Sequence, residues 1–205
     1  MTEQWITHPT ILFGESVDLI PLEKQHFEEL FIAASDAKLW EFIPLNCSVK
    51  ETFEMAYNSA LEERERGNQY PFVVYHKQTK ELIGSTRFLE IFPKDLKLEI
   101  GWTWITQKYW ATEINLECKL LQLTFAFEIL KTRRVQIKTD ENNIRSRKAI
   151  EKIGGKFEGI LRKDKIRENG TSRNAAYFSI IDDEWEEVKK NLSTKLNEKR
   201  KALNL

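Results

Sequence analysis

Two side chains that can exchange protons stand close to the ends of expected secondary-structure elements. Ser146 follows Asn143 by three residues, a spacing that brings both to one side of the first turn of an expected helix. Glu99 lies in the strand-like run Leu98–Ile105. Because a hydroxyl can donate a proton and a carboxylate can accept one, both are candidates for general acid–base catalysis. The structural alternatives are a helix-start hydroxyl without chemistry for Ser146, a hydrogen-bonded sheet carboxylate for Glu99, and an N-cap for Asn143.

Alternation along the strand that carries Glu99 predicts which side chains share a face. One face would carry Glu99, Gly101 and Thr103. The opposite face would carry four larger apolar side chains, Leu98, Ile100, Trp102 and Trp104.

These candidates belong to a predicted strand–turn–helix–strand unit. A compact turn at residues 107–112 follows the first strand, a strongly apolar helix runs to about Leu130, and a second strand covers Arg134–Thr139. We expect the two strands to be parallel, because a helix connects them. The helix N-terminus between them offers unpaired N–H groups and the positive end of the helix dipole, which suit a phosphorylated ligand.

Length and charge narrow the class of protein. The chain has 205 residues, of which 41% are hydrophobic, enough for the core of one domain. The 32 basic residues balance the 32 acidic ones, so no global charge favours nucleic acid or an anionic membrane. No apolar run approaches the ~20 residues of a membrane span. Residues 1–9 lack the pattern of a signal peptide, and we expect a cytoplasmic protein.

The cysteines and histidines predict neither a disulfide nor a metal site. Cys47 and Cys118 lie far apart without metal-type spacing, and Cys118 falls on the apolar helix. The three histidines are scattered along the chain. We expect buried, reduced thiols.

The remaining elements complete one mixed α/β domain. We expect a short strand at Val17–Pro21, a helix at Glu23–Ala34 and a second helix at Ser48–Arg66 that starts at a capping box. Three strands follow at Tyr70–His76, Glu81–Ile91 and Leu96–Ile105, and the last of them is the first strand of the central unit. After it we expect a helix ending at a glycine pair, a hairpin around Asn169-Gly170, and a final helix. The predicted sheet is mostly antiparallel, is flanked by helices, and contains one parallel pair of central strands.

Several short motifs resemble one known family. They are Gly84–Phe88, Leu98–Trp102, Asn143–Ser146, Ala149–Gly154, Glu158-Gly159, Arg173-Asn174 and Glu184-Trp185. Together with the element order, they resemble the GCN5-related N-acetyltransferases (GNAT), and most closely the branch that acetylates N-termini of bacterial ribosomal proteins (RimJ/RimL-like). The resemblance implies an acyl-CoA N-acyltransferase fold over residues 10–190 as a single domain, followed by a charged C-terminal tail at 191–205.

The resemblance also implies where acetyl-CoA would bind as cosubstrate. The family holds it between two splayed strands, here Leu98–Ile105 and Arg134–Thr139, with the pantetheine arm against the backbone of Trp104 and Ile105. The pyrophosphate would lie on the turn and helix start, and Asn143 is a further candidate contact. The cofactor-binding residues implied in that turn are Trp110, Ala111, Thr112, Glu113, Ile114 and Asn115.

The turn departs from the family pattern of a basic or polar residue followed by glycines. Trp110 occupies the basic or polar position, Glu113 the central glycine and Asn115 the last small residue. A carboxylate about 6 Å from a phosphate charge would cost on the order of 3 kcal/mol at an effective dielectric of 20, and under about 1 kcal/mol if solvated. Glu113 either points to water or weakens the coenzyme site. Four cations could offset the repulsion: Lys108, Arg145, Arg147 and Lys148.

Acetyl transfer to an amine needs a deprotonated amine and a proton for the departing thiolate. The resemblance implies Glu99 as the base and Ser146 as the acid. At about pH 7.5 a lysine of pKa ~10.4 costs roughly 4 kcal/mol to deprotonate, against under ~0.5 kcal/mol for an α-amine of pKa ~7.8. The predicted acceptor is therefore an α-amine of a protein N-terminus or a small-molecule amine, in a pocket formed by Trp40, Phe42, Arg87 and Trp102.

Two other functions remain open from the sequence. A degenerate GNAT fold could bind CoA or a metabolite without turnover, which Glu113 would explain. An interaction module could use the tail Lys189–Leu205 as its contact. The oligomeric state, a homodimer included, is also open.

Overall fold

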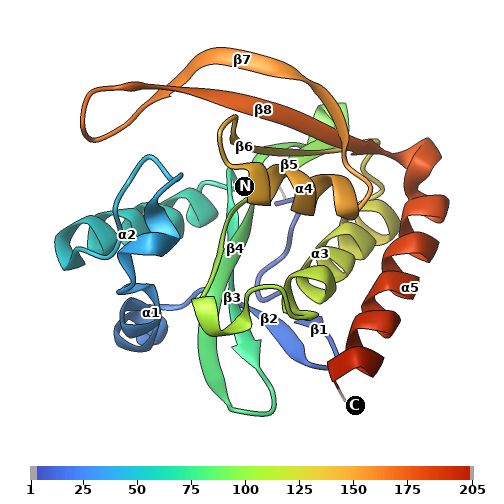
Figure 1. Cartoon of the computed structure of the whole chain (residues 1–205), viewed down its shortest axis with the longest axis horizontal. Helices are drawn as coiled ribbons and strands as arrows, with labels where there is room; N and C mark the ends of the chain where they lie inside the picture. Colours follow the sequence, from blue (N-terminus) through green and yellow to red (C-terminus); the bar gives the residue numbers. More distant parts are fainter. Residues whose placement is uncertain (1–3, 204–205) are drawn as a thin grey trace.

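The computed structural model describes residues 4–203, which form one eight-stranded sheet with helices on both faces (Figure 1). The strand order is β1-β2-β3-β4-β5-β6-β8-β7, and among the strands of residues 4–203 only β5 and β6 pair in parallel. The strands are β1 Leu12–Phe13, β2 Val17–Pro21, β3 Tyr70–His76, β4 Glu81–Phe92, β5 Lys97–Ile105, β6 Arg134–Asp140, β7 Lys156–Ile166 and β8 Ser172–Ile181. The α-helices are α1 Phe27–Ala34, α2 Lys50–Glu65, α3 Ile114–Thr124, α4 Ile144–Lys152 and α5 Trp185–Leu203. The predicted mixed α/β architecture with a parallel central pair is confirmed.

The sheet separates two hydrophobic cores. The larger lies between the sheet and α3, α4 and α5, where Ile114, Leu123 and Ile150 are buried. The smaller lies on the α1–α2 side and includes Leu30 and Phe53. Each helix turns its apolar face to the sheet, which removes that surface from water at about 25 cal/mol per Å².

A β-bulge in β5 reverses the predicted alternation of its side chains. Trp102 has a φ of +49°, and the pairing with β4 shifts between Gly101 and Trp104. Past the bulge, Trp102 and Trp104 pack against the α1–α2 core, whereas Ile100 remains in the α3–α5 core. Thr103 then turns toward α3. The predicted faces were therefore wrong beyond Gly101, because an extra residue in one strand changes the parity of all that follow.

Two other differences concern helix ends. Ser48 does not form the predicted capping box, since its hydroxyl bonds Asn46 Oδ1 at 2.7 Å and the N-cap of α2 is Val49. The predicted tail beginning at residue 191 falls inside α5, where Leu192 and Leu196 are buried in the larger core. Their four-residue spacing places both on one helix face.

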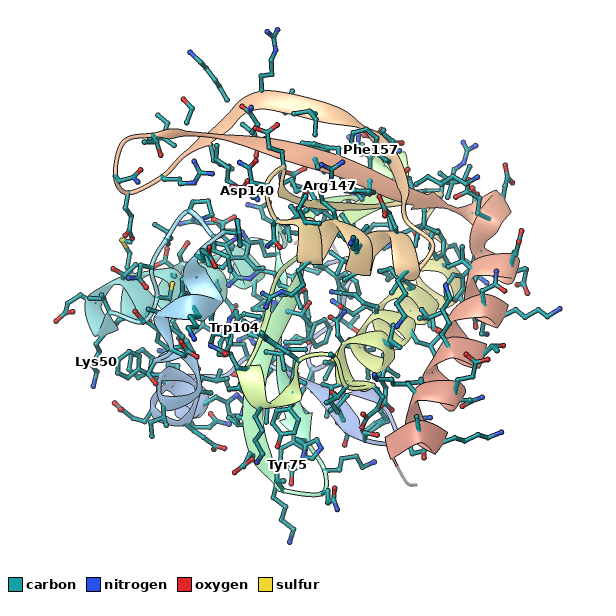
Figure 2. All side chains as sticks on the ribbon, in the orientation of Figure 1. Lys50, Tyr75, Trp104, Asp140, Arg147 and Phe157 are labelled. Carbon is teal, nitrogen blue, oxygen red and sulfur yellow. The ribbon has the colours of Figure 1, made fainter. Side chains whose placement is uncertain are left out.

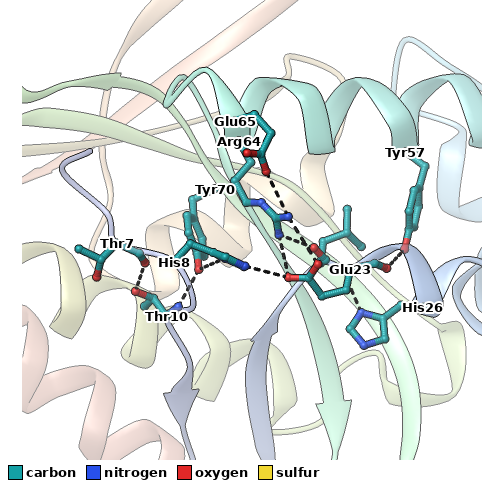
Figure 3. Close-up of polar contacts among 10 residues, drawn as sticks. Thr7, His8, Thr10, Glu23, His26, Tyr57, Arg64, Glu65 and Tyr70 are labelled. Carbon is teal, nitrogen blue, oxygen red and sulfur yellow. Dashed lines mark hydrogen bonds and ion pairs between the residues drawn. The ribbon is translucent and has the colours of Figure 1, made fainter. Parts of the chain in front are cut away.

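A polar cluster fastens the N-terminal segment to α2 (Figure 3). Glu23 binds Arg64 at 3.1 Å and His8 at 3.2 Å, and the Tyr70 hydroxyl accepts the N–H of Thr10. The cluster lies beside β2 and β3, near the opposite edge of the sheet from β7, and none of its residues lines the cavity described below.

Among residues 4–203, no helix is long and apolar enough to cross a membrane, and no group of His, Cys, Asp or Glu is arranged to hold a metal. Cys47 and Cys118 are buried free thiols. Burial raises the pKa of each thiol to about 12, so both are protonated at neutral pH.

Candidate active site

A large cavity opens where the two parallel strands diverge. β5 and β6 pair only from Lys97–Glu99 to Arg134–Gln136, after which β5 follows β4 and β6 follows β8. The space between the separated strands is a cavity of about 1110 Å³, bordered by the starts of α3 and α4. Figure 2 labels Trp104 on β5 and Asp140 at the end of β6. The cavity is large enough for a ligand of cofactor size.

Most of the residues predicted for the site line this cavity. Those that do are Phe42, Glu99, Trp102, Trp104, Ile105, Trp110, Ala111, Thr112, Asn115, Asn143 and Ser146. Four predicted residues do not: Trp40, Arg87, Glu113 and Ile114.

The four exceptions have distinct places in the fold. Trp40 donates from Nε1 to Ala34 O and packs on Trp104 at 5.5 Å between ring centroids. The Arg87 guanidinium lies 4.6 Å from the centre of the Trp102 ring. Both therefore support the tryptophans that form the cavity wall from behind it.

The other two exceptions lie at the N-terminus of α3. Ile114 is fully buried in the core, and its backbone N–H donates to Thr112 Oγ1 at 3.4 Å. Glu113 is the N-cap residue of α3, is partly exposed and makes no side-chain cap hydrogen bond.

The turn before α3 is closed by a tryptophan rather than by glycines. Trp110 Nε1 donates to Ile105 O at 2.7 Å, and Ala111 adopts a left-handed φ of +59°. The Arg145 guanidinium lies 3.6 Å from the centre of the Trp110 ring, a cation–π contact across the cavity from α4 to this turn. Arg145 is thus the one of the four predicted offsetting cations that lines the cavity.

The start of α4 presents a free hydroxyl. Asn143 is the N-cap, and its Oδ1 accepts the backbone N–H of Ser146 at 2.9 Å. Ser146 is partly exposed and lines the cavity. Its Oγ makes no hydrogen bond within residues 4–203, so it is available to a bound ligand.

Glu99 is a buried carboxylate with one free oxygen. It is 2% exposed, and Oε2 accepts from Gln136 Nε2 at 2.7 Å and from Lys138 Nζ at 3.1 Å. Burial raises the pKa of this carboxyl, although the Lys138 charge opposes the shift. A Cβ at position 101 would come within 3.0 Å of Oε1, so Gly101 leaves room for that oxygen beside the cavity.

The other end of the cavity lies under the β7–β8 hairpin. Glu168 at the hairpin tip donates its N–H to Pro44 O and accepts the N–H of Asn46 at 3.1 Å. Asp140 is fully buried and holds the hairpin near the same tip through Arg167 and through Arg173 at 3.3 Å. The loop that the hairpin tip contacts lines the cavity at this end with Phe42, Ile43, Pro44 and Leu45.

Comparison with known proteins identifies the family. Residues 17–156 match the model of the acetyltransferase (GNAT) domain. The chain belongs to the GNAT family. It is an acetyltransferase, as the sequence resemblance predicted.

Two curated relatives and one solved structure show how far the similarity to this GNAT protein extends. YoaA of Bacillus subtilis strain 168, called an uncharacterized N-acetyltransferase, is 25% identical over 174 residues, or 83% of this chain and 96% of YoaA. YdaF of the same strain, called a putative ribosomal N-acetyltransferase, is 37% identical over 91 residues, or 44% of this chain and 48% of YdaF. The crystal structure of a GCN5-related N-acetyltransferase from Brucella melitensis superposes with a TM-score of 0.85 at 27% identity, covering 93% of this chain and 86% of that one.

One residue of this GNAT cavity was missed in the sequence. Lys119 on α3 is 5% exposed, and its Nζ donates to Thr103 Oγ1 at 2.8 Å, Gln122 Oε1 at 3.1 Å and Thr86 Oγ1 at 3.4 Å. These three acceptors are neutral, and burial lowers the pKa of Lys119 to about 8. The available signal was a lysine within the apolar stretch of a helix.

Lys119→Met is expected to stabilise this GNAT domain most at neutral pH. Below pH 8 the folded ammonium is buried without a counter-charge, at a cost of up to about 3 kcal/mol for a pKa lowered from 10.5 to about 8. As pH rises from 8 to 10.5 the folded amine loses its proton first and the cost disappears. Thr103 Oγ1 and Gln122 Oε1 also contact Thr86 Oγ1, at 2.7 Å and 3.2 Å, so the loss of the ammonium leaves neither atom without a hydrogen-bond partner.

Melting temperatures of both proteins between pH 6.5 and 10 test this expectation. The advantage of Lys119→Met should shrink steadily above pH 8. A difference that does not vary with pH would mean that burial does not lower the pKa of Lys119.

Proposed function

We propose that this protein transfers the acetyl group of acetyl-CoA to an α-amine, either of a protein N-terminus or of a small molecule. The observation that carries the proposal is the cavity itself, because it joins an anion-binding helix start to a free hydroxyl and a buried carboxylate. Acetyl-CoA supplies an activated acetyl group as its thioester.

The donor would fit the cavity along its length. The β5 edge near Trp104 and Ile105 is not paired to β6, so its backbone can accept the amides of the pantetheine arm as an added strand would. The start of α3 offers unpaired N–H groups to the pyrophosphate. Arg145 adds a positive charge at the position where Trp110 has replaced a polar residue.

Ser146 would act as the acid on the departing thiolate of CoA, and Glu99 would act as the base on the acceptor amine. The amine nitrogen attacks the thioester carbonyl, the carbon–sulfur bond breaks, and the thiolate takes a proton from Ser146 Oγ. Glu99 Oε1 takes the proton released by the amine, and passage of a proton from Glu99 through solvent to the Ser146 alkoxide would restore both groups. Its raised pKa makes it a stronger base than an exposed glutamate, while its ion pair with Lys138 keeps it ionised.

The energetics favour an α-amine. Near pH 7.5 an α-amine gives up its proton at under ~0.5 kcal/mol, whereas a lysine side chain requires roughly 4 kcal/mol. Glu99, whose charge Lys138 partly neutralises, is better suited to deprotonating an α-amine than to deprotonating a lysine side chain. The name of YdaF, a putative ribosomal N-acetyltransferase, agrees with a protein N-terminus as acceptor.

A thiol-release assay with matched peptides tests the acceptor. One peptide has a free N-terminus and no lysine, and its partner has a blocked N-terminus and one lysine, with free amino acids and polyamines as further acceptors. Turnover restricted to the free α-amine would support the proposal. Tight CoA binding without release for any amine would instead support a degenerate GNAT fold.

Glu113→Gly is expected to tighten CoA binding by less than tenfold. Glu113 is partly exposed and does not line the cavity, so its charge acts through solvent and costs under about 1 kcal/mol. Isothermal titration at low and high salt measures the effect. Glu113→Gln serves as control, because it removes the charge without adding backbone freedom.

A hundredfold gain in both variants that shrinks with salt would contradict this placement of Glu113. The coenzyme site would then be a weakened one, and the non-enzymatic alternative would be favoured.

A further inference from the structure

The coenzyme cavity extends beyond the start of α3 to two lysines that no part of the proposed chemistry uses. Lys152 is the last residue of α4 and Lys199 lies in α5, and both line the cavity. Neither ammonium lies within ion-pair distance of a carboxylate within residues 4–203. They form a positive rim of the cavity where the end of α4 meets α5.

The position of Lys199 is fixed by contacts on both sides of it. Lys195 Nζ, one helical turn earlier, donates to Lys152 O at 2.7 Å and holds α5 against the end of α4. Arg200 lies 2.9 Å from Glu117 Oε1 and holds α5 against the first turn of α3. Figure 1 shows α5 running beside α3, with the end of α4 close to it. Lys199 therefore lies where α3, α4 and α5 meet.

The other charged groups nearby are paired or turned away. Lys189 binds Glu128 at 2.6 Å, and Arg200 is held by glutamates. The acidic neighbours Glu151 and Glu198 are exposed and do not line the cavity. The cavity rim at Lys152 and Lys199 is therefore electropositive.

We propose that Lys152 and Lys199 bind the 3′-phosphate of CoA. This inference rests on the proposed use of acetyl-CoA. The 3′-phosphate and the pyrophosphate are attached to the same ribose, so a pyrophosphate on the start of α3 would bring the second phosphate toward α5, which Arg200 holds against the first turn of α3. A phosphomonoester carries about −1.5 to −2 charges at pH 7, which two unpaired ammonium groups match.

The test compares CoA with 3′-dephospho-CoA, which differs only in this phosphate. Affinities are measured by isothermal titration for the wild type, Lys152→Ala, Lys199→Ala and the double variant. The wild type should prefer CoA by about tenfold or more, since each partly exposed ion pair contributes a few-fold. The double variant should lose this preference while its affinity for dephospho-CoA stays unchanged.

Lys201→Ala is the matched control, because Lys201 is an exposed lysine of the same helix that does not line the cavity. It should keep the preference for CoA, and high salt should reduce the preference of the wild type. Equal affinity of the wild type for both ligands, or equal loss of both in the double variant, would overturn the subsite and leave the proposed function standing. Failure of the wild type to bind either ligand would overturn both.

Discussion

Ser146→Ala should lower kcat ten- to a thousandfold while the affinity for CoA changes little. The hydroxyl is the group that would protonate the thiolate, and a positioned general acid typically contributes about 10²–10⁴-fold. The substitution leaves the helix start intact, because Asn143 caps the backbone N–H of Ser146 and not its side chain. Steady-state kinetics on an accepted amine, with CoA titration of the same protein, separates turnover from binding.

Ser146→Thr provides the matched control, since it keeps a hydroxyl at the same position. Partial recovery of kcat relative to the alanine variant is the expected result. Full activity of Ser146→Ala would remove Ser146 from the mechanism and leave it as a helix-start residue.

Glu99→Gln should reduce kcat/KM ten- to a hundredfold for lysine-like amines and less than tenfold for α-amines. Lysine-like amines depend more on a base, because their deprotonation near neutral pH costs much more free energy than that of α-amines. The pH profile should change as well. In the wild type, activity should rise with pH through the pKa of Glu99, which burial raises above the ordinary value for glutamate, and this acidic limb should be absent from the variant.

Lys138→Met offers an independent check on the same carboxylate. Lys138 lies 3.1 Å from Glu99 and opposes the rise in its pKa, so its loss should move the acidic limb to higher pH. Equal loss of activity on both amine classes in Glu99→Gln, with no change in the pH profile, would show that Glu99 has only a structural role.

Much of the fold could be predicted because local patterns and tertiary contacts agree. The strand Tyr70–His76 has the predicted limits, and the strand–turn–helix–strand unit correctly predicted the parallel pairing of β5 and β6. The predicted end of the second helix at Arg66 agrees with the C-cap of α2, and Gly67 follows it with a left-handed φ of +76°. In each case one residue type or one periodicity determines the local structure.

The parts that could not be predicted depend on contacts distant in sequence. Nothing local indicates that Trp102, rather than a glycine, adopts the left-handed conformation of the bulge. Ser48 has the residue spacing of a capping box, yet Asn46 competes for its hydroxyl. Arg87 has the chemistry of a binding residue, but its position in the sheet places it behind the wall of the cavity.

In two places the sequence contained a signal that average composition concealed. The predicted tail is strongly charged, yet Leu192 and Leu196 have the spacing of a buried helix face. Lys119 interrupts an apolar helix and lies in the cavity. A residue that contradicts its surroundings is therefore informative about both packing and function.

Glu117 joins parts of the chain that the ribosome produces at very different times. Its buried carboxylate accepts the backbone N–H groups of Glu15 and Ser16 and also binds Arg200. Until Arg200 has been synthesised, docking of α3 would bury this charge without its cation, at a cost of about 3–5 kcal/mol. The helix α3, whose start borders the cavity, should therefore reach its final position only after α5 has left the exit tunnel and Arg200 can pair with Glu117.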